Sequence, residues 1–541
     1  MSMTLVKNTT IQNRSKQLRL SSEHTIPIHC IKEPEVFQFL QSLLDYGVSK
    51  ENLLFSIGSE LLAGNKNPSV RKFLSEYKFQ KVVVEKIPRT EFDLLGSVYQ
   101  YLNSKRENLE KGSFYTGGET AEDFVSDLDF GAGEVIFDPA CGSGSFLFRS
   151  SAPAEQIYGI DNDPIAIMIA KINYFIKFPE AKYPNLYCED FFVWYSKNKD
   201  MKFDYIISNP PYGANLDLSK IPTEHISSGE SFSYFIEIGY KMLKNDGIFR
   251  YLLPEAVLNV KRHMDIRDFI LGHTNLEKIK KYSKKFSGVM SDLYMLELNH
   301  VVSHQMLFVN KVTTVIPKDI FKSLQNHIFV HLTDQDIAII EKVNKLKKYD
   351  LSTSIFGLGV VTGDNRSKLF NSPRPNADHI YTGKEVEKYI LLSAKNFIIF
   401  DRENLQQVAP DEIYRAPKKL VYKTINKYLK VAMDTTGSLT SNSANIIIPK
   451  IPQLDIYTVM AFLNSSLYSY LHFKLFGGVN KIAKENLMAL PFPGITAEVN
   501  SIINKLTKDA IQRGNDEVLQ KYINQDVFGL TGEEVEYIQT F

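Results

Sequence analysis

The sequence predicts an α/β fold, in which a doubly wound, mostly parallel sheet is followed by a separate C-terminal domain. Short apolar runs at 134–138 and 156–161 have the length and composition of buried strands. A glycine-rich stretch separates the two runs, and a helical pattern over 164–177 follows the second. Strands that alternate with helices in this way form parallel sheets with helices on both faces.

The same alternation continues through the middle of the chain. Apolar spacing predicts a helix over 231–244, and Asn245-Asp246-Gly247 behind it has the composition of a turn. Further strands of the sheet are predicted at 185–190, 203–208, 248–253, 293–298 and 306–309.

Two regions of different character flank this central part. Residues 1–105 show helical apolar spacing with few turn signals, which predicts a helical N-terminal region. After residue 314, clusters of glycine and proline become frequent and the strand–helix alternation stops. We therefore predict three parts, namely 1–105, 106–314 and 315–541, the last being a domain of mixed α/β structure.

Composition limits the kinds of partner and site that the chain can have. Its 541 residues exceed what one hydrophobic core usually holds. The formal net charge is +1, so any site for a polyanion must be a local basic patch. The three cysteines (Cys30, Cys141 and Cys188) form no CxxC pair, so neither a disulfide framework nor a metal site is expected. No signal peptide or membrane-spanning apolar run is apparent, which predicts a soluble cytoplasmic protein.

The tetrapeptide Asn209-Pro210-Pro211-Tyr212 follows directly after the predicted strand 203–208. Two consecutive prolines cannot continue a strand ladder, because neither has an N–H to donate. They stiffen a loop at the edge of the sheet where open α/β folds hold their ligands. The amide of Asn209 can hold an amino group, and a flat base can stack on the ring of Tyr212. The motif therefore suggests a site that presents a planar nitrogen for reaction.

Ligand-type groups also follow the three strands before this motif. The Gly142-Ser143-Gly144 turn lets a ligand approach the backbone and the start of a following helix. Asp161 at the end of the second strand can accept both hydroxyls of a ribose. Asp190 ends the third strand, and the ring of Phe191 beside it could stack on a purine. A tight structural turn and ordinary helix caps are the alternative interpretations, although four such groups on four successive strands favour a ligand site.

Two of these segments resemble the paired signatures of a known enzyme family. The segment 138–147 (DPACGSGSFL) and Asn209-Pro210-Pro211-Tyr212 look like the motifs of the S-adenosylmethionine-dependent DNA adenine-N6 methyltransferases. The segment 112–116 (GSFYT) looks like the one that closes over the methionine end of the cofactor, although Gly117 and Gly118 stand where the family usually has proline. The order of these motifs is similar to the gamma class. Landmarks similar to the target-recognition domain of its TaqI-like members occur at 381–385, 419–424, 462–465 and 487–491.

The resemblance implies a function for each part of the chain. Residues 106–314 would bind S-adenosylmethionine and catalyse methyl transfer, and 315–541 would recognise the DNA target. The resemblance implies a cofactor site formed by Tyr115, Thr116, Asp138, Ala140, Gly142, Gly144, Asp161, Asp190, Phe191 and Asn209.

Chemistry at the motif agrees with that family. The amino group of adenine is a poor nucleophile because its lone pair is delocalised into the ring. The Asn209 side-chain oxygen and the Pro210 carbonyl can accept its hydrogens and stabilise the charge that develops on nitrogen. Such a base must leave the duplex, and Tyr212 would stack on it. The resemblance suggests Phe286 as a second stacking ring, with an ordinary core residue as the alternative.

Basic residues gather where contact with DNA phosphates would need them. One cluster precedes Phe286, and another spans 415–430 without an intervening acid. A solvated helix face is the alternative for the first cluster, and an ordinary amphipathic element is the alternative for the second. The predicted domain context favours DNA contact. The predicted DNA-binding residues are Lys284, Lys285, Lys418, Lys419, Lys423 and Lys427.

Together these observations predict a site-specific DNA adenine-N6 methyltransferase that acts on duplex DNA as a monomer, either as an orphan enzyme or paired in the cell with a cognate restriction endonuclease. One rival is the modification subunit of a multi-subunit restriction enzyme, which borrows recognition from a partner. Another is a protein-glutamine or RNA methyltransferase, since the Asn-Pro-Pro-Tyr motif suits any planar amide or amine. A non-catalytic DNA-binding protein on the same fold would have no use for Asn209 and Tyr212.

Overall fold

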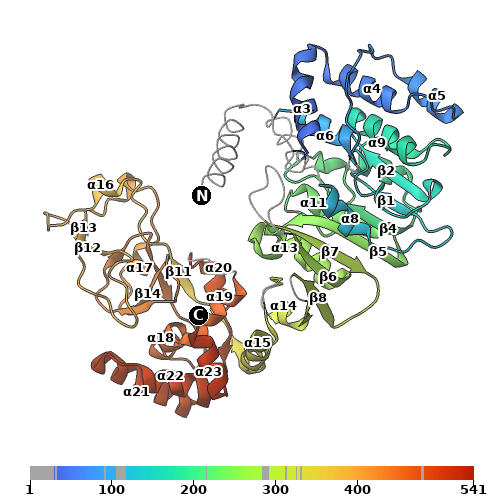
Figure 1. Ribbon diagram of the computed structural model, residues 1–541. Coiled ribbons are helices and arrows are strands. Elements are labelled where there is room, and N and C mark those ends of the chain that lie inside the picture. The colour runs from blue at the N-terminus through green and yellow to red at the C-terminus, as the bar shows by residue number, and fades with distance from the viewer. Residues whose placement is uncertain are drawn as a thin grey trace, which may run out of the picture. The chain divides into compact units, whose positions relative to one another are not determined.

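The computed structural model describes residues 30, 33–90, 93–104, 117–214, 216–282, 292–310, 313–323, 326–328, 332–476 and 481–541. The chain folds into two compact units, 1–313 and 314–541, whose elements are labelled in Figure 1. Among the described residues, no helix has both the length and the apolar character that a membrane span requires.

The first unit is built on a sheet with strand order β3-β2-β1-β4-β5-β7-β6-β8-β9, whose last strand begins at the final residue of the unit. Strands β3, β2, β1, β4 and β5 run parallel, whereas β7 is antiparallel to both β5 and β6. The α/β class predicted from the sequence is confirmed. The strands are β1 (Ile136–Asp138), β2 (Ile157–Asp161), β3 (Asn185–Cys188), β4 (Phe203–Ser208), β5 (Leu243–Pro254), β6 (Asn275–Tyr282), β7 (Leu293–Asn299), β8 (Gln305–Val309) and β9 (Thr313–Pro317).

Helices with clear start signals connect the parallel strands. In α9 (Pro164–Lys177) the Asp163 carboxylate accepts hydrogen bonds from the N–H groups of Ile165 and Ala166, and proline occupies the first turn. Asp190 caps α10 (Phe191–Lys197) in the same way. The helices α8 (Gly118–Val125), α11 (Ser231–Lys241), α12 (Ala256–Asn259) and α13 (Met264–His273) complete this part of the unit.

Three local expectations differ from the structure. The predicted turn at Asn245-Asp246-Gly247 is wrong: these residues lie inside β5, where the pairing with β4 shifts between Phe203↔Leu243 and Tyr205↔Ile248. The expected helix behind the Gly142-Ser143-Gly144 turn is also absent, because residues 139–149 form successive turns. Strand β6 was not predicted, since its lysines obscure the apolar alternation.

Four helices and an irregular stretch at 77–90 make up most of the described N-terminal residues, and they pack against the sheet unit. The helices are α3 (Pro34–Ser42), α4 (Lys50–Leu61), α5 (Pro68–Glu76) and α6 (Leu94–Leu102). Figure 1 shows α4 and α6 beside α9, and both helices contact it. The approach is close, because a Cβ built on Gly58 of α4 would lie 2.3 Å from Cδ1 of Ile172 in α9. The side chains of both regions belong to one continuous core.

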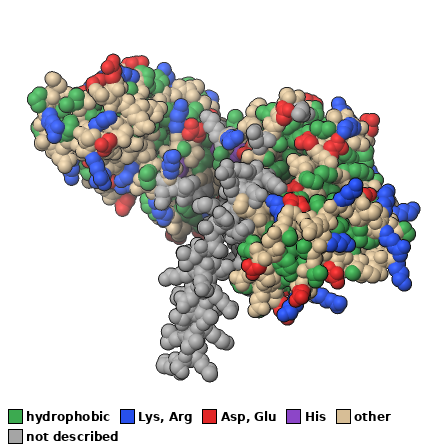
Figure 2. Space-filling view, turned by 90° about the horizontal axis from the view of Figure 1, so that it is seen from above, with side chains coloured by type: hydrophobic (Ala, Val, Ile, Leu, Met, Phe, Trp, Pro, Cys, Tyr) green, Lys and Arg blue, Asp and Glu red, His purple; other side chains and the backbone are tan. Residues whose placement is uncertain are grey.

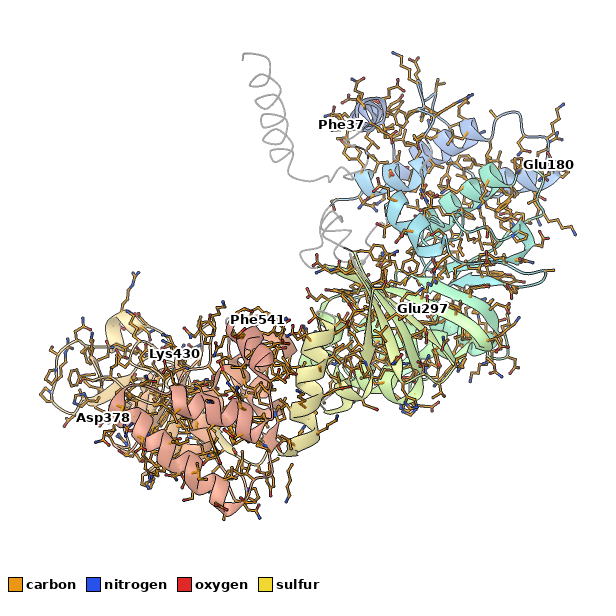
Figure 3. All side chains as sticks on the ribbon, turned by 60° about the horizontal axis from the view of Figure 1, so that its bottom comes forward. Phe37, Glu180, Glu297, Asp378, Lys430 and Phe541 are labelled. Carbon is orange, nitrogen blue, oxygen red and sulfur yellow. The ribbon has the colours of Figure 1, made fainter. Side chains whose placement is uncertain are left out.

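A buried ion cluster ties α8 to the antiparallel side of the sheet. Arg250 on β5 is only 2% exposed. Its guanidinium donates to Glu297 on β7 at 2.6 Å, to the Phe124 carbonyl in α8 at 2.8 Å, and to both carboxylate oxygens of Asp127 just after this helix. Glu297 is labelled among the sheet side chains in Figure 3. Because a buried guanidinium needs this full set of acceptors, the cluster specifies how α8 is placed.

The second unit contains small sheets and a group of helices, as the loss of strand–helix alternation predicted. One sheet has the order β11-β17-β14-β15, another β13-β12-β16, and β10 pairs with β18. The strands are β10 (Lys347–Tyr349), β11 (Ile355–Gly357), β12 (Asp378–Tyr381), β13 (Asn396–Ile398), β14 (Lys419–Lys423), β15 (Val431–Asp434), β16 (Leu439–Thr440), β17 (Ala444–Ile448) and β18 (Phe492–Pro493).

Helices close one side of this unit through polar as well as apolar contacts. Asn464, the last residue of α18, is fully buried. Its amide accepts from the N–H of Val431 at 3.0 Å and donates to the carbonyl of the same residue at 2.7 Å, so it pairs with β15 as another strand would. The helices are α14 (Asp319–Ser323), α15 (Asp334–Leu346), α16 (Asn365–Lys368), α17 (Asp411–Tyr414), α18 (Ile456–Asn464), α19 (Ser466–Leu475), α20 (Lys484–Ala489), α21 (Ala497–Arg513), α22 (Glu517–Lys521) and α23 (Gly532–Gln539).

Candidate functional site

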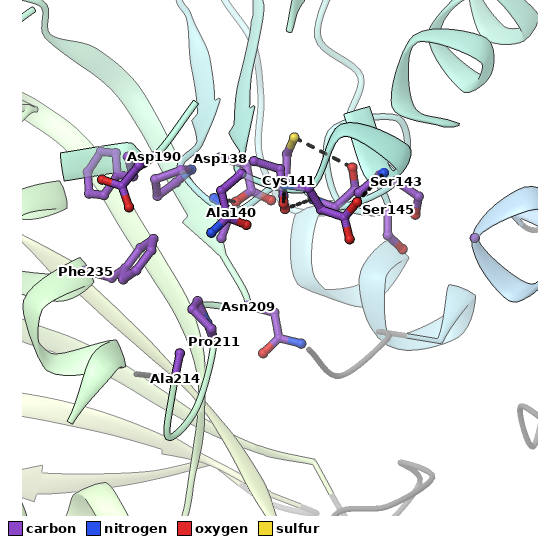
Figure 4. A pocket seen from close by; sticks show the side chains of 18 of the residues that line it. Asp138, Ala140, Cys141, Ser143, Ser145, Asp190, Asn209, Pro211, Ala214 and Phe235 are labelled. Atoms are coloured by element: carbon purple, nitrogen blue, oxygen red, sulfur yellow. Dashed lines mark hydrogen bonds between the residues drawn. The ribbon is translucent and has the colours of Figure 1, made fainter. Parts of the chain in front are cut away.

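A cavity of about 570 Å³ lies at the carboxyl ends of the parallel strands in the first unit. Residues after β1, β2, β3 and β4 line it together, as Figure 4 shows for Asp138, Asp190 and Asn209. This is where open α/β sheets bind ligands, and the volume suits a cofactor-sized molecule. The structure thus brings together the strand ends that the sequence singled out.

Asp138 ends β1 and is almost completely buried. One of its oxygens, Oδ1, accepts hydrogen bonds from Ser208 Oγ at 2.7 Å and from the Ala140 N–H at 3.0 Å. Burial, together with the neighbouring Asp161 carboxylate, raises the pKa of Asp138 to about 7 even though these two hydrogen bonds lower it. A positively charged ligand group beside Asp138 would favour the ionised carboxylate and lower this pKa.

The glycine turn after β1 has a left-handed backbone. Gly142 has φ +53° and Gly144 has φ +85°, values that side chains rarely adopt. A Cβ on Gly144 would also lie 2.0 Å from the ring of Phe148. Gly142 lines the cavity with Ser143 and Ser145, whereas Gly144 does not line it and serves the turn itself.

Both acids at the next strand ends face the cavity and are anchored by backbone N–H groups. Asp161 Oδ2 accepts from Gly142 N at 2.9 Å, and its Oδ1 accepts from Asp163 N at 2.9 Å. Asp190 Oδ1 accepts from Phe192 N at 2.9 Å as the cap of α10. The helix-cap interpretation of Asp190 is therefore correct, and it is compatible with a ligand role because each carboxylate has about four acceptor positions.

Two aromatic rings form the wall beyond Asp190. Phe191 lines the cavity but is 3% exposed and belongs to the core. Its ring stacks on Phe235 of α11 at a centroid distance of 5.2 Å. Phe235 lines the cavity as well and was not predicted. Its only sequence signal is the apolar spacing of a core helix, which does not distinguish a cavity wall.

The Asn-Pro-Pro-Tyr loop is held from both sides. The Tyr212 hydroxyl lies 2.5 Å from Asn209 Oδ1 and 2.7 Å from the Leu252 carbonyl, and donates to this pair of acceptors. Burial raises the pKa of Tyr212, so its hydroxyl keeps its proton at neutral pH. Asn209 and Pro211 line the cavity, whereas the buried Pro210 and the half-buried Tyr212 do not.

Residues at the start of α11 hydrogen-bond to the same loop, and they were not predicted from the sequence as part of the site. Ser231 Oγ donates to the Pro211 carbonyl at 2.5 Å and accepts from the Ala214 N–H at 3.2 Å. The Glu230 carboxylate accepts from the N–H of Gly213 at 2.7 Å. These bonds fix the turn that presents Asn209. Glu230 and Ser231 follow the motif by about twenty residues, so only their serine-before-helix pattern could have indicated them.

Some predicted site residues lie outside the described residues. These are Tyr115 and Thr116 of the closing segment, the stacking candidate Phe286, and Lys284 and Lys285.

No cluster of metal-ligating side chains occurs in the part of the chain that the structure describes. The thiol of Cys141 lines the cavity, but burial raises its pKa well above the ordinary value, so it stays protonated and is a poor nucleophile.

Two family models match the chain at the places where the motifs occur. Residues 90–351 match the N-6 DNA Methylase family, and residues 378–492 match the TaqI-like C-terminal specificity domain. Residues 90–351 thus form an N-6 DNA methylase domain. The expected resemblance to the TaqI-like adenine-N6 methyltransferases is confirmed, and the C-terminal match lies within the separate second unit.

Individual relatives of this methylase are distant. The Type II methyltransferase M.VspI of Vibrio sp. (strain 343) is 26% identical over 310 residues, which make up 54% of this chain and 75% of that protein. The Type I restriction enzyme MjaIX methylase subunit of Methanocaldococcus jannaschii is 34% identical over 149 residues, 25% of each chain. The Type IIL restriction-modification enzyme MmeI, solved in complex with DNA, has a TM-score of 0.56 at 10% identity and 95% coverage of both chains. The likeness to MmeI shows the fold alone.

The cofactor of this methylase family is S-adenosylmethionine, and the cavity fits it. The cofactor carries a carboxylate, an ammonium, a sulfonium, a ribose and a purine. The cavity offers anchored acids at Asp138, Asp161 and Asp190 for its cationic and hydroxyl groups, and aromatic walls for its base. The backbone turn at Gly142 has no side chain to obstruct the approach.

Three of the six basic side chains of segment 415–430 in the methylase's second unit are engaged in internal ion pairs. Arg415 donates to Asp378 at 2.6 Å and Lys430 to Glu387 at 2.5 Å; Asp378 and Lys430 are labelled in Figure 3. In the view of Figure 2, basic side chains are interspersed with acidic and apolar ones on the exposed surface. A continuous basic surface is therefore not formed by this segment as a whole.

One of the predicted DNA contacts must be corrected. Lys419 is fully buried, and its ammonium donates to Asp434 Oδ2 at 2.5 Å and to the Tyr414 carbonyl at 2.6 Å. A phosphate cannot reach this group. Lys418 and Lys427 are exposed and Lys423 is half-buried, so these three side chains remain accessible.

A second cavity, of about 390 Å³, lies in the same unit. Lys384 and Lys423 line it with short polar side chains, and Ile425 at its edge is 67% exposed. Two of the sequence landmarks, 381–385 and 419–424, meet here. The remaining polar lining residues are Asn365, Thr382, Asn396, Ser441 and Ser443.

We predict that cofactor affinity depends on the ionisation of Asp138. Its pKa of about 7 means that the carboxylate is mostly charged at pH 7.5 and mostly protonated at pH 5.5. The Kd for S-adenosylmethionine, measured by calorimetry, should therefore rise roughly tenfold from pH 7.5 to pH 5.5. Asp138→Asn should bind weakly at both values. A pH profile of Asp138→Asn identical to that of the parent would contradict the prediction.

The same raised pKa has a consequence for folding. Because the pKa lies above the ordinary 3.8, the buried carboxylate lowers the free energy of unfolding fully above pH 7, and this destabilisation disappears as the pH falls toward 4. Asp138→Asn should thus unfold at a higher urea concentration than the parent at pH 8 without cofactor.

Lys419→Met should act on stability rather than on DNA affinity. It leaves the Asp434 carboxylate buried without its cation, which costs about 3 kcal/mol of unfolding free energy. Urea denaturation should show the loss, and hydrogen exchange should locate it in β14 and β15. The exposed Lys427→Met serves as the matched control and should unfold like the parent. An unchanged midpoint for Lys419→Met would contradict the prediction.

Proposed function

We propose that this methylase transfers a methyl group from S-adenosylmethionine to N6 of an adenine in a specific duplex DNA sequence. The observation that carries the proposal is the position of Asn209 at the end of β4, beside the cofactor cavity, with its side-chain oxygen next to the Tyr212 hydroxyl. The N-6 DNA Methylase match over residues 90–351 supports N6 as the atom that receives the methyl group.

In the proposed mechanism, the chain orients the amino group and stabilises its charge. Asn209 Oδ1 and the Pro210 carbonyl accept the two amino hydrogens, which favours a more tetrahedral nitrogen and stabilises the positive charge that develops on it. The bound cofactor would supply an activated methyl group, whose bond to the sulfonium breaks as the bond to nitrogen forms and leaves a neutral thioether. The methylated nitrogen is acidic enough to lose a proton to solvent. Neither a strong base nor a covalent enzyme intermediate is required.

Tyr212 has two functions in this proposal. Its hydroxyl orients the Asn209 amide, and its ring, edge-on to Phe232 at 6.2 Å, forms one face of the pocket for the base. The target nitrogen is inaccessible in a duplex, so the adenine must be flipped out of the stack. Phe286 remains the predicted second stacking ring.

Recognition of the DNA sequence is assigned to the second unit. The match of residues 378–492 to a TaqI-like specificity domain supports a chain that carries its own recognition. It therefore favours a self-contained enzyme over the modification subunit of a multi-subunit restriction enzyme, although the relatives include Type I methylase subunits. We infer that the enzyme acts as a monomer and protects sites from a cognate restriction endonuclease.

We assign the accessible lysines to contacts with the phosphates of the DNA backbone. Lys418, Lys423 and Lys427 belong to β14 or its flanking loops, and an ammonium acts on phosphate as a mobile point charge. The cavity lined by Lys384 and Lys423 carries amide and hydroxyl groups, which suit hydrogen bonding to base edges.

Sequencing of methylated bases tests the proposed function. A host that expresses the parent chain should carry N6-methyladenine at a single sequence motif. Asn209→Ala should abolish this modification, because the amino group loses its side-chain acceptor, while the thermal stabilisation of the purified protein by S-adenosylmethionine persists. Asp161→Ala serves as the contrasting variant, and its primary defect should be weaker binding of S-adenosylmethionine. A parent strain without modified adenine would refute the proposal, as would full methylation by Asn209→Ala.

Salt dependence tests the assignment of the lysines. The association constant for duplex DNA that contains the methylated motif should fall with salt concentration. In a plot of its logarithm against log salt concentration, Lys427→Ala should make the slope shallower by about 1, since one phosphate contact is lost. Lys505→Ala on the exposed surface of α21 is the control and should keep the parental slope. Equal slopes for both variants would remove Lys427 from the DNA interface.

A further inference from the structure

Helix α6 of the N-terminal region forms one wall of the cofactor cavity. Gly96, Tyr99, Gln100 and Asn103 line the cavity. They follow one another at intervals of three, one and three residues, which places them on one helix face. The opposite face buries Leu94, Leu95, Val98 and Tyr101 in the core. A helix that only covered the sheet unit would not require polar side chains on the face that lines a ligand cavity.

Hydrogen bonds connect α6 to the acid at the end of β2. The Tyr99 hydroxyl donates to Asp163 Oδ2 at 2.5 Å. Asp163 also caps α9 through its other oxygen, and its N–H donates to Asp161 Oδ1 at 2.9 Å. Tyr99 thus holds the turn that orients the Asp161 carboxylate toward the cavity.

A second connection reaches the glycine turn. Asp93, which caps α6, accepts from the Asn173 side-chain amide at 2.9 Å. The same amide nitrogen donates to the Ser143 carbonyl at 3.0 Å. Because α6 is linked to both the β1 and the β2 sides of the cavity, its position determines the width of the cavity.

Gln100 provides the observation that points to a ligand contact. Its Oε1 atom is buried and has no hydrogen-bond partner among the described residues. A buried acceptor without a donor destabilises a fold by about 1–3 kcal/mol, so such atoms are rare unless they have a function. This one belongs to a side chain that lines the cavity.

We propose that α6 is a cofactor-binding element, in which the Gln100 amide accepts a hydrogen bond from a donor group of S-adenosylmethionine and Tyr99 is a positioning residue for Asp161. The proposal rests on the assignment of this cavity to the cofactor. It extends the cofactor site into the N-terminal region, to which the sequence assigned a helical structure but no function.

Cofactor binding to the full chain, measured without DNA, tests the role of Gln100. Gln100→Met keeps the length of the side chain and removes its polar atoms. The Kd for S-adenosylmethionine by calorimetry should rise about five- to tenfold, the effect of one lost hydrogen bond. S-adenosylhomocysteine should lose affinity by a similar factor, because it shares every donor group with the cofactor. Gln41→Met on the exposed face of α3 is the matched control and should bind like the parent.

Thermal melting separates a ligand contact from a structural role. Without cofactor, Gln100→Met should melt at the parental temperature or higher, since the buried acceptor is gone. With saturating cofactor its stabilisation should be smaller than that of the parent. Tyr99→Phe should also weaken cofactor binding, by a smaller factor. Gln100→Met that binds within twofold of the parent, or that melts lower without cofactor, would overturn the role of α6; a parent chain that fails to bind the cofactor would instead overturn the proposed function.

Discussion

The hydrogen bond from Ser208 Oγ to Asp138 Oδ1 is the interaction on which the rest of the site depends. It is 2.7 Å long, and both side chains are buried. The bond joins the carboxyl end of β1, which leads into the glycine turn, to the carboxyl end of β4, which leads into Asn209. Group transfer requires the two reactants to meet in a narrow range of geometry. A short bond between buried partners provides this, because neither water nor side-chain motion competes with it.

Polar groups around the cofactor cavity are arranged for a ligand at the expense of the fold. The pKa of Asp138 is raised toward neutrality, and the Gln100 acceptor is buried without a donor among the described residues. Both features cost free energy of folding that the protein alone does not recover. The surrounding structure maintains them through rigid partners, namely the capped helices α9 and α10 and the core shared with α4 and α6. Ligand binding then restores part of this stability by linkage.

The sequence predicted well those features that depend on neighbouring residues. Strand β4 and helix α9 have the expected bounds, because an apolar run and an Asp-Pro cap are local signals. Features that depend on distant partners could not be predicted. The lysines of β6 pair with Asp123, Asp127 and Glu297, and the buried state of Lys419 depends on Asp434 across the neighbouring strand. The role of Gln100 has no local sequence signal, because it depends on a cavity that β1 and β2 build later in the chain.

The pairing of lysines inside the second unit bears on how specificity could arise. Between residues 415 and 430, Arg415, Lys419 and Lys430 are held by acids of the same unit. For the proposed function on DNA, these paired cations are not free to contact phosphates, which every DNA sequence offers alike. Contacts that only the right sequence offers would then have to supply a larger share of the binding free energy. In this way the internal salt bridges of the second unit would favour discrimination between right and wrong sites.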